Sequence, residues 1–277
     1  MGGGETYSSI KHFSNRLLRL LFVFEPVSIV LKTLIFALEG RSSTYIVLRV
    51  IQSIVFYPYG ALWYIQAMIV GIWMLYFLVL KENKKRLGYC AGIPLFFVAI
   101  VCNSYYFLVE NSVIGKYVRL YLKVAVSARN GIFYGFFVLW VGFISYRVYK
   151  KNLVPSVIVK ISFLVCYSLY LIELWNLKDK VMKDDGSIFI MSIPVTACLL
   201  MLSVRRKEVN NQTVILRNLS TGIYLLHRPI LYILTIIQIL FSIDISHEIQ
   251  FFMVSCAAVI ICCVAYKRNY RIARYLK

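Results

Sequence analysis

The sequence predicts an all-α fold, a polytopic membrane helix bundle with about eight transmembrane helices and additional interfacial helices. The first reason is the apolar content. Hydrophobic residues make up 60% of 277, or about 166 side chains, which is more than the core of a soluble chain of this length can bury. The second reason is that eight spans of about 20 residues would use about 160 of them. We therefore expect one membrane domain over residues 1–277 and no soluble domain.

Long apolar runs broken by charged residues mark the candidate spans. Two of the runs are short for a full crossing, so a re-entrant or closely packed segment is the alternative for 131–146 and 187–203. The remaining six candidates are 17–38, 61–80, 88–108, 155–175, 219–242 and 249–266. An even number of spans places both termini on the same side of the membrane.

The charge of the chain is expected to report its orientation. There are 31 Lys and Arg residues against 12 Asp and Glu, a net charge of +19, which in a soluble protein would suggest a nucleic-acid partner. Between eight spans, 19 of the basic residues fall on the side of the termini and 9 on the opposite side. Because basic loops stay inside, this bias predicts cytoplasmic termini, and we expect no nucleic acid as a partner.

Two segments outside the spans have the pattern of amphipathic helices that lie along the outer interface. In 45–57 the apolar side chains recur at helical spacing, whereas Arg49, Gln52 and Ser53 point away from them. In 113–126 the basic residues Lys116, Arg119 and Lys123 line one side. Both segments are expected to contact membrane lipids as headgroup anchors, and the alternative is a cradle for an anionic acceptor.

Ionisable side chains at membrane depth are candidate functional residues because they are costly to place there. Glu25 and Lys32 share a helix face but lie about 10 Å apart, so each needs a partner on another helix. Lys160 and Glu173 lie near opposite ends of one span, where reaching toward the interface is the simpler explanation. The seven cysteines lie in or beside apolar spans without ligand spacing, so no metal site is expected.

The segment 218–229 carries polar side chains in a stripe. Ser220, Tyr224 and His227 recur at i, i+4 and i+7, so a hydroxyl, a phenol and an imidazole share one face of an apolar helix. Pro229 cannot donate a backbone hydrogen bond, which predicts a bent or opened helix beside the histidine. His227 is a candidate acid or base, and the alternative is a structural tie between two helices.

Three segments, taken in order, resemble the integral membrane acyltransferases of the acyltransferase-3 family. Gly60-Ala-Leu-Trp-Tyr-Ile-Gln-Ala-Met-Ile69 is similar to a helix start of that family. Ala128-Arg-Asn-Gly-Ile-Phe-Tyr-Gly-Phe-Phe137 resembles its Arg-Asn-Gly segment, and Gly222-Ile-Tyr-Leu-Leu-His227 resembles its Tyr-Leu-Leu-His helix. The basic segment 10–19 is similar to the start of a later helix, usually the third.

The resemblance implies transfer of an acyl group, such as acetyl, from cytosolic acyl-CoA to a hydroxyl of an envelope glycan or lipid-linked sugar. It also implies a bacterial plasma (inner) membrane location, with acetyl-CoA as co-substrate rather than as a bound cofactor. His227 and Tyr224 would be catalytic. Arg129, Asn130 and Trp63 would bind the acceptor. Arg86, Arg205 and Arg206 would hold CoA phosphates, unless they are only the positive-inside signal.

The sequence departs from the family pattern in two places. The first family helix, with its arginine and catalytic histidine, has no counterpart, so the chain is expected to lack the first two helices. Arg228 stands where the family more often has proline directly after the histidine. Either the chain is a shortened product with weakened or lost activity, or it is a divergent member with a rearranged site.

Two other functions compete with acyl transfer. A transporter or flippase-like protein for a lipid-linked sugar would use Glu25, Lys32 and His227 to line its path, although no inverted repeat is visible. A polymerase of envelope sugars would carry a large outer loop, and the longest loop here has only 22 residues, from 109 to 130.

Overall fold

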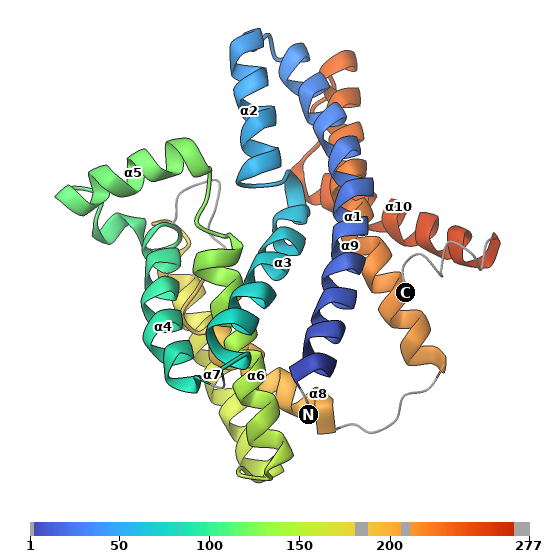
Figure 1. The fold of residues 1–277 in the computed structure, drawn as a ribbon. Coiled ribbons are helices and arrows are strands. Elements are labelled where there is room, and N and C mark those ends of the chain that lie inside the picture. Colours follow the sequence, from blue (N-terminus) through green and yellow to red (C-terminus); the bar gives the residue numbers. More distant parts are fainter. Residues whose placement is uncertain (1–2, 83, 181–187, 206–210, 269–277) are drawn as a thin grey trace. The chain divides into compact units, whose positions relative to one another are not determined.

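The computed structural model describes residues 3–82, 84–180, 188–205 and 211–268, and in these ranges it contains helices and no strand. This confirms the all-α fold (Figure 1). The long helices are α1 (Gly3–Leu38), α6 (Phe136–Lys150), α7 (Ser156–Leu177), α9 (Asn211–Phe241) and α10 (His247–Arg268). The shorter ones are α2 (Ser43–Val55), α3 (Trp63–Leu75), α4 (Lys85–Val101), α5 (Val113–Ala125) and α8 (Ser192–Arg205), with the single turns η1 (Gly60–Leu62), η2 (Tyr76–Leu80), η3 (Tyr106–Leu108) and η4 (Gly131–Gly135).

Six helical stretches of the described residues are long and apolar enough to cross a membrane. They overlap six of the eight predicted spans, and their length and composition support an integral membrane protein. The stretch Ser43–Leu80 begins well before the predicted 61–80 and includes the segment 45–57, which was predicted to lie along the interface. The predicted span 131–146 is longer than its apolar run suggested, because η4 and α6 form one stretch of 20 residues. The prediction for 88–108 was too long, since α4 ends at Val101. For 187–203 the structure gives α8, whose 14 residues rise only about 21 Å, and residue 187 lies outside the described ranges.

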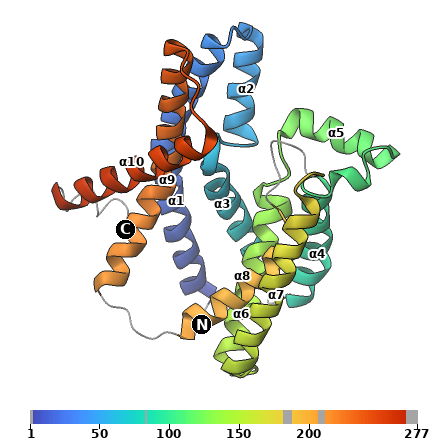
Figure 2. The ribbon, with the colours of Figure 1, turned by 180° about the vertical axis from the view of Figure 1, so that it is seen from behind.

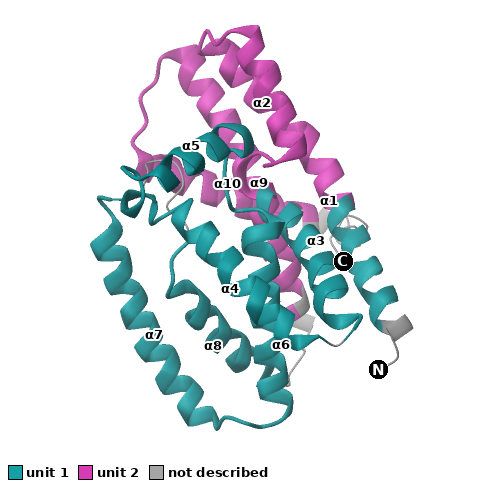
Figure 3. Ribbon diagram, turned by 60° about the vertical axis from the view of Figure 1, so that its left-hand side comes forward, with its two compact units in different colours: residues 1–18, 63–207 teal, residues 19–62, 208–277 magenta. Residues whose placement is uncertain are grey.

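The chain divides into two compact units (Figure 3). Unit 1 comprises residues 1–18 and 63–207, and unit 2 comprises residues 19–62 and 208–277. The first helix α1 begins at Gly3 rather than at residue 17, so the basic segment 10–19 is itself helical.

Small residues allow close helix packing in unit 1, where α4, α6, α7 and α8 lie side by side (Figures 1 and 2). A Cβ added to Gly135 would stand 2.2 Å from the carbonyl oxygen of Ala67, and a Cβ on Gly71 would stand 2.6 Å from the carbonyl carbon of Gly135. The small residues of α3, Ala67 and Gly71, and those of η4, Gly131 and Gly135, are each spaced four apart. They bring the backbones of α3 and η4 into direct contact. Beside this contact lies an apolar cluster formed by Leu75, Val79, Phe136 and Trp140.

Glu173 attaches the start of α8 to α7. Its carboxylate accepts hydrogen bonds from the backbone N–H groups of Ile190 at 2.7 Å and Met191 at 2.8 Å, and from the hydroxyl of Tyr105. The carboxylate of Glu173 therefore has hydrogen-bond partners inside unit 1 and a structural role there, and its position relative to the interface stays a prediction. Lys160, near the other end of α7, is exposed as expected.

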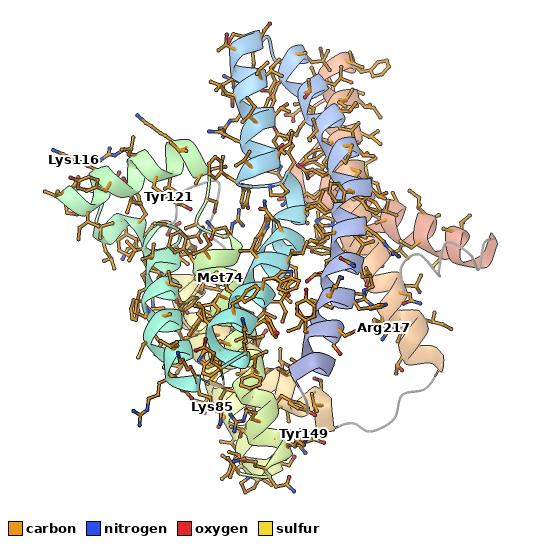
Figure 4. The ribbon with its side chains drawn as sticks, in the orientation of Figure 1. Met74, Lys85, Lys116, Tyr121, Tyr149 and Arg217 are labelled. Atoms are coloured by element: carbon orange, nitrogen blue, oxygen red, sulfur yellow. The ribbon has the colours of Figure 1, made fainter. Side chains whose placement is uncertain are left out.

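The helix α5 lies across one end of the other helices of unit 1 (Figures 1 and 3). Its exposed surface is formed by apolar side chains such as Tyr117 and Leu120 together with Lys116, which points away at the far end of the helix (Figure 4). This arrangement is the one expected of an interfacial helix that contacts lipids.

In unit 2 the helix α2 turns its polar face toward protein. Ser53 is buried, whereas the apolar residues Val47, Ile51 and Ile54 are exposed. The sequence pattern separated these two faces correctly. The polar face, however, does not look into water, because in a lipid environment polar side chains find their partners inside the protein.

Candidate active site

The loop between α5 and η4 holds the two polar residues of the Arg-Asn-Gly segment in unit 1. Asn130 is the N-cap of η4, where its side-chain oxygen accepts hydrogen bonds from the N–H groups of Ile132 at 3.1 Å and Phe133 at 3.0 Å. The backbone N–H of Arg129 donates to the hydroxyl of Ser127 at 3.1 Å. These bonds determine the backbone path that presents the Arg129 side chain.

Arg129 lies against the first residue of α3. Its guanidinium carbon is 4.9 Å from the centre of the Trp63 ring, which is the geometry of a cation–π contact. The centre of the Trp63 ring also lies 6.0 Å from that of Tyr134, with the two rings tilted by 58°. The structure thus brings together Arg129, Asn130 and Trp63, the three residues that the sequence predicted for the acceptor.

Tyr121 of α5 is part of this group, although the sequence reasoning missed it. Its hydroxyl accepts a hydrogen bond from the side-chain amide of Asn130 at 2.9 Å and donates to the carbonyl of Ser127 at 3.5 Å. The side chain of Tyr121 is labelled in Figure 4. Burial raises the pKa of the Tyr121 phenol, and the bond from Asn130 acts in the opposite direction. The helical spacing of Val118, Tyr121 and Ala125 was a usable signal, since these residues form the protein-facing side of α5.

Asn130 has a different role from the one predicted. Its oxygen caps η4 and its amide donates to Tyr121, so both ends of the side chain are used inside unit 1. Its contribution is to position Arg129. The groups that can contact a ligand are then the guanidinium of Arg129 and the neighbouring aromatic rings. A guanidinium can bind an oxyanion or a sugar hydroxyl, and aromatic rings can pack against the apolar face of a sugar.

The three arginines predicted to hold CoA phosphates do not form one group in the described residues. Arg86 is exposed in the first turn of α4. Arg205 ends α8, and its guanidinium donates to the carbonyl oxygen of Val154 at 2.6 Å, which ties the loop before α7 to this helix end. Arg206 lies outside the described residues.

The two predicted catalytic residues lie in unit 2, on α9. The rings of Tyr224 and His227 are 5.9 Å apart, and both side chains are half-buried. The hydroxyl of Tyr224 donates a hydrogen bond to the carbonyl oxygen of Ala61 in η1. This bond ties η1 to α9, which is a positioning role, so His227 is the proton-transfer candidate of the pair. The helix is continuous through Pro229, so its backbone is not opened there, and the bend expected as the alternative stays a prediction.

Glu25, the remaining predicted intramembrane acid, is buried in unit 2. One carboxylate oxygen accepts the backbone N–H of Tyr59 at 3.3 Å. Residues from α1 and from the segment before η1 thus meet at this carboxylate, as the need for a partner outside its own helix predicted.

Comparison with known proteins identifies the family. The acyltransferase domain of the acyltransferase-3 family matches residues 3–268. An amino-acid racemase of Enterococcus faecalis is 29% identical over 158 residues, which cover 53% of this chain and 20% of that protein. The chain therefore spans about a fifth of the length of this curated relative. No solved structure matches the chain. The family match extends over nearly the whole sequence and includes all three segments that carried the resemblance, so the chain belongs to the acyltransferase-3 family.

Proposed function

We propose that this membrane protein is an O-acyltransferase that moves an acetyl group from cytosolic acetyl-CoA to a hydroxyl of a cell-envelope glycan. The observation that carries the proposal is the family match over residues 3–268. The cation–π pair of Arg129 and Trp63 supports it, because a guanidinium beside half-buried aromatic rings is a suitable environment for a polar sugar.

The proposed reaction needs a base that removes the proton of the attacking hydroxyl. A hydroxyl has almost no alkoxide at neutral pH, so a general base contributes about 10²–10⁴-fold to the rate. His227 fits this role by residue type and by its half-buried position on α9. The hydroxyl oxygen attacks the thioester carbonyl, the bond to sulfur breaks, and the thiol of CoA leaves with a proton.

The orientation proposed for this reaction has both termini in the cytoplasm of a bacterial plasma membrane. The bias of basic residues toward the side of the termini supports this orientation. Arg86 is exposed and available to a CoA phosphate from that side. Arg205 already donates to Val154, which makes it the weaker donor-binding candidate.

The test is a transfer assay with purified protein in liposomes, with labelled acetyl-CoA and an envelope glycan. We expect label in the glycan, and loss of at least 100-fold of the rate in His227→Ala with unchanged folding. Tyr224→Phe, which loses the bond to Ala61, should retain most of the rate. The proposal is wrong if the wild type transfers no label to any envelope glycan tested.

A second candidate function is movement of a lipid-linked sugar. It is favoured by the buried position of Glu25 and the half-buried position of Lys32 on α1, since polar groups at membrane depth line transport paths. Protein that moves the lipid-linked sugar across liposomes without consuming acetyl-CoA would support transport instead of transfer.

A further inference from the structure

Lys32 and Arg228 carry positive charge in the membrane-spanning helices of unit 2. The ammonium nitrogen of Lys32 lies 5.3 Å from the centre of the Tyr232 ring and 5.2 Å from that of Phe36. Lys32 is half-buried between these aromatic faces, whereas Arg228 is exposed. The proposed reaction gives no role to either of these two cations.

Arg228 and Tyr232 lie one turn apart on α9 and pack against the same point of the backbone. A Cβ added to Gly60 would stand 2.9 Å from Cγ of Arg228 and 2.9 Å from the hydroxyl oxygen of Tyr232. Gly60 has φ of +66°, a conformation that favours glycine. The turn before α3 therefore leaves room for both side chains, and Tyr232 is a neighbour of both cations.

Within the described ranges, neither Lys32 nor Arg228 forms an ion pair with an acidic side chain. Among the described residues, the ion pairs are Arg41 with Glu39 and Lys84 with Glu82. The carboxylate of Glu39, at the end of the helix that carries Lys32, is paired with Arg41 at 3.4 Å. Tyr232 links the two cations, because Lys32 lies over its ring and Arg228 packs beside the same glycine, Gly60, as its hydroxyl. Like charges that lie together at membrane depth are unfavourable without a counter-ion.

We propose that Lys32 and Arg228, together with the hydroxyl of Tyr232, form a binding site for one phosphate group. Guanidinium and ammonium groups are the donors that bind phosphate in proteins, and a phenol hydroxyl adds a further donor. The phosphate group belongs either to the headgroup of an anionic lipid or to a free phosphate ion. The inference concerns binding alone and does not depend on acyl transfer.

The test measures the thermal unfolding midpoint of the delipidated full chain in detergent. Phosphatidylglycerol is compared with zwitterionic phosphatidylcholine, and inorganic phosphate with chloride at equal ionic strength. We expect phosphatidylglycerol to raise the midpoint more than phosphatidylcholine does. A rise with inorganic phosphate as well identifies a general phosphate site, and a rise with the lipid alone identifies a headgroup site. If neither raises the midpoint, the proposal is wrong.

Single-residue variants test which side chains form the phosphate site. Lys32→Gln and Arg228→Gln should each weaken the apparent affinity for phosphatidylglycerol by about 10-fold or more. Arg217→Gln is the matched control, because Arg217 is an exposed arginine of the same helix (Figure 4). The charge-preserving variants Lys32→Arg and Arg228→Lys should retain the affinity, which separates loss of charge from loss of folding. Equal weakening by Arg217→Gln would contradict the assignment.

Discussion

Replacing Gly135 by alanine tests how the backbone of 131–135 is held against α3. The added Cβ would stand 2.2 Å from the carbonyl oxygen of Ala67 and 2.8 Å from its carbonyl carbon. Ordinary contacts begin at 3.4 Å, so the two backbones must separate by about 1 Å. Such an insertion into packed structure costs about 1–3 kcal/mol, of which the better helix propensity of alanine returns up to about 1 kcal/mol.

We therefore expect Gly135→Ala to lower the free energy of unfolding by about 1–2 kcal/mol, measured by denaturant titration in detergent micelles. The control is Gly142→Ala in α6. Its added Cβ would meet only Cδ2 of Leu200 at 3.8 Å, so this variant should be neutral or slightly stabilising. The reasoning is refuted if Gly135→Ala is as stable as Gly142→Ala.

Three further predictions concern unit 1. Glu173→Gln should destabilise the protein by about 1–3 kcal/mol in the same titration, because an amide cannot accept hydrogen bonds from three donors as a carboxylate does. An unchanged midpoint of the denaturant titration would contradict the attachment of α8 to α7 through Glu173. Asn130→Ala removes the acceptor for the N–H groups of Ile132 and Phe133 and should cost about 1–2 kcal/mol, whereas Asn130→Asp should retain this cap. Because the pKa of Tyr121 is raised in the folded protein, its stabilising effect is complete below the ordinary phenol pKa and declines as the pH rises above it. An alkaline absorbance titration of wild type minus Tyr121→Phe should show one phenol that ionises above pH 10, and ionisation at or below pH 10 would contradict the burial.

Composition and periodicity were sufficient to predict the long helices with extensive exposed apolar surface. The exposed apolar surface of α7 is continuous, with Leu164 and Trp175 as examples, so a simple search for apolar runs finds it. The ends of α4 and α8 could not be predicted in the same way. The apolar run containing α4 continues past Val101 into η3, and hydropathy does not register that change of backbone.

The residues of the candidate site could be predicted from the sequence, but the contacts between these residues could not. The motif positions of Arg129 and Trp63 identified both residues, yet their stacking depends on the packing of η4 against α3. The bond between Tyr121 and Asn130 joins residues nine apart through a loop, and no periodicity describes such a loop. The hydrogen bonds of Glu173 could not be predicted, because its partners Ile190 and Met191 contribute backbone groups that carry no signal in the sequence.

The central claim is that Arg129, seated on Trp63, binds the acceptor in an acyl transfer. The most direct measurement is the steady-state KM of Arg129→Gln for the glycan and for acetyl-CoA, in liposomes. We predict that kcat/KM for the glycan falls by about 10- to 100-fold, as expected for loss of one charged hydrogen bond, while the KM for acetyl-CoA stays unchanged. An unchanged value for the glycan, or an effect confined to acetyl-CoA, would contradict the claim.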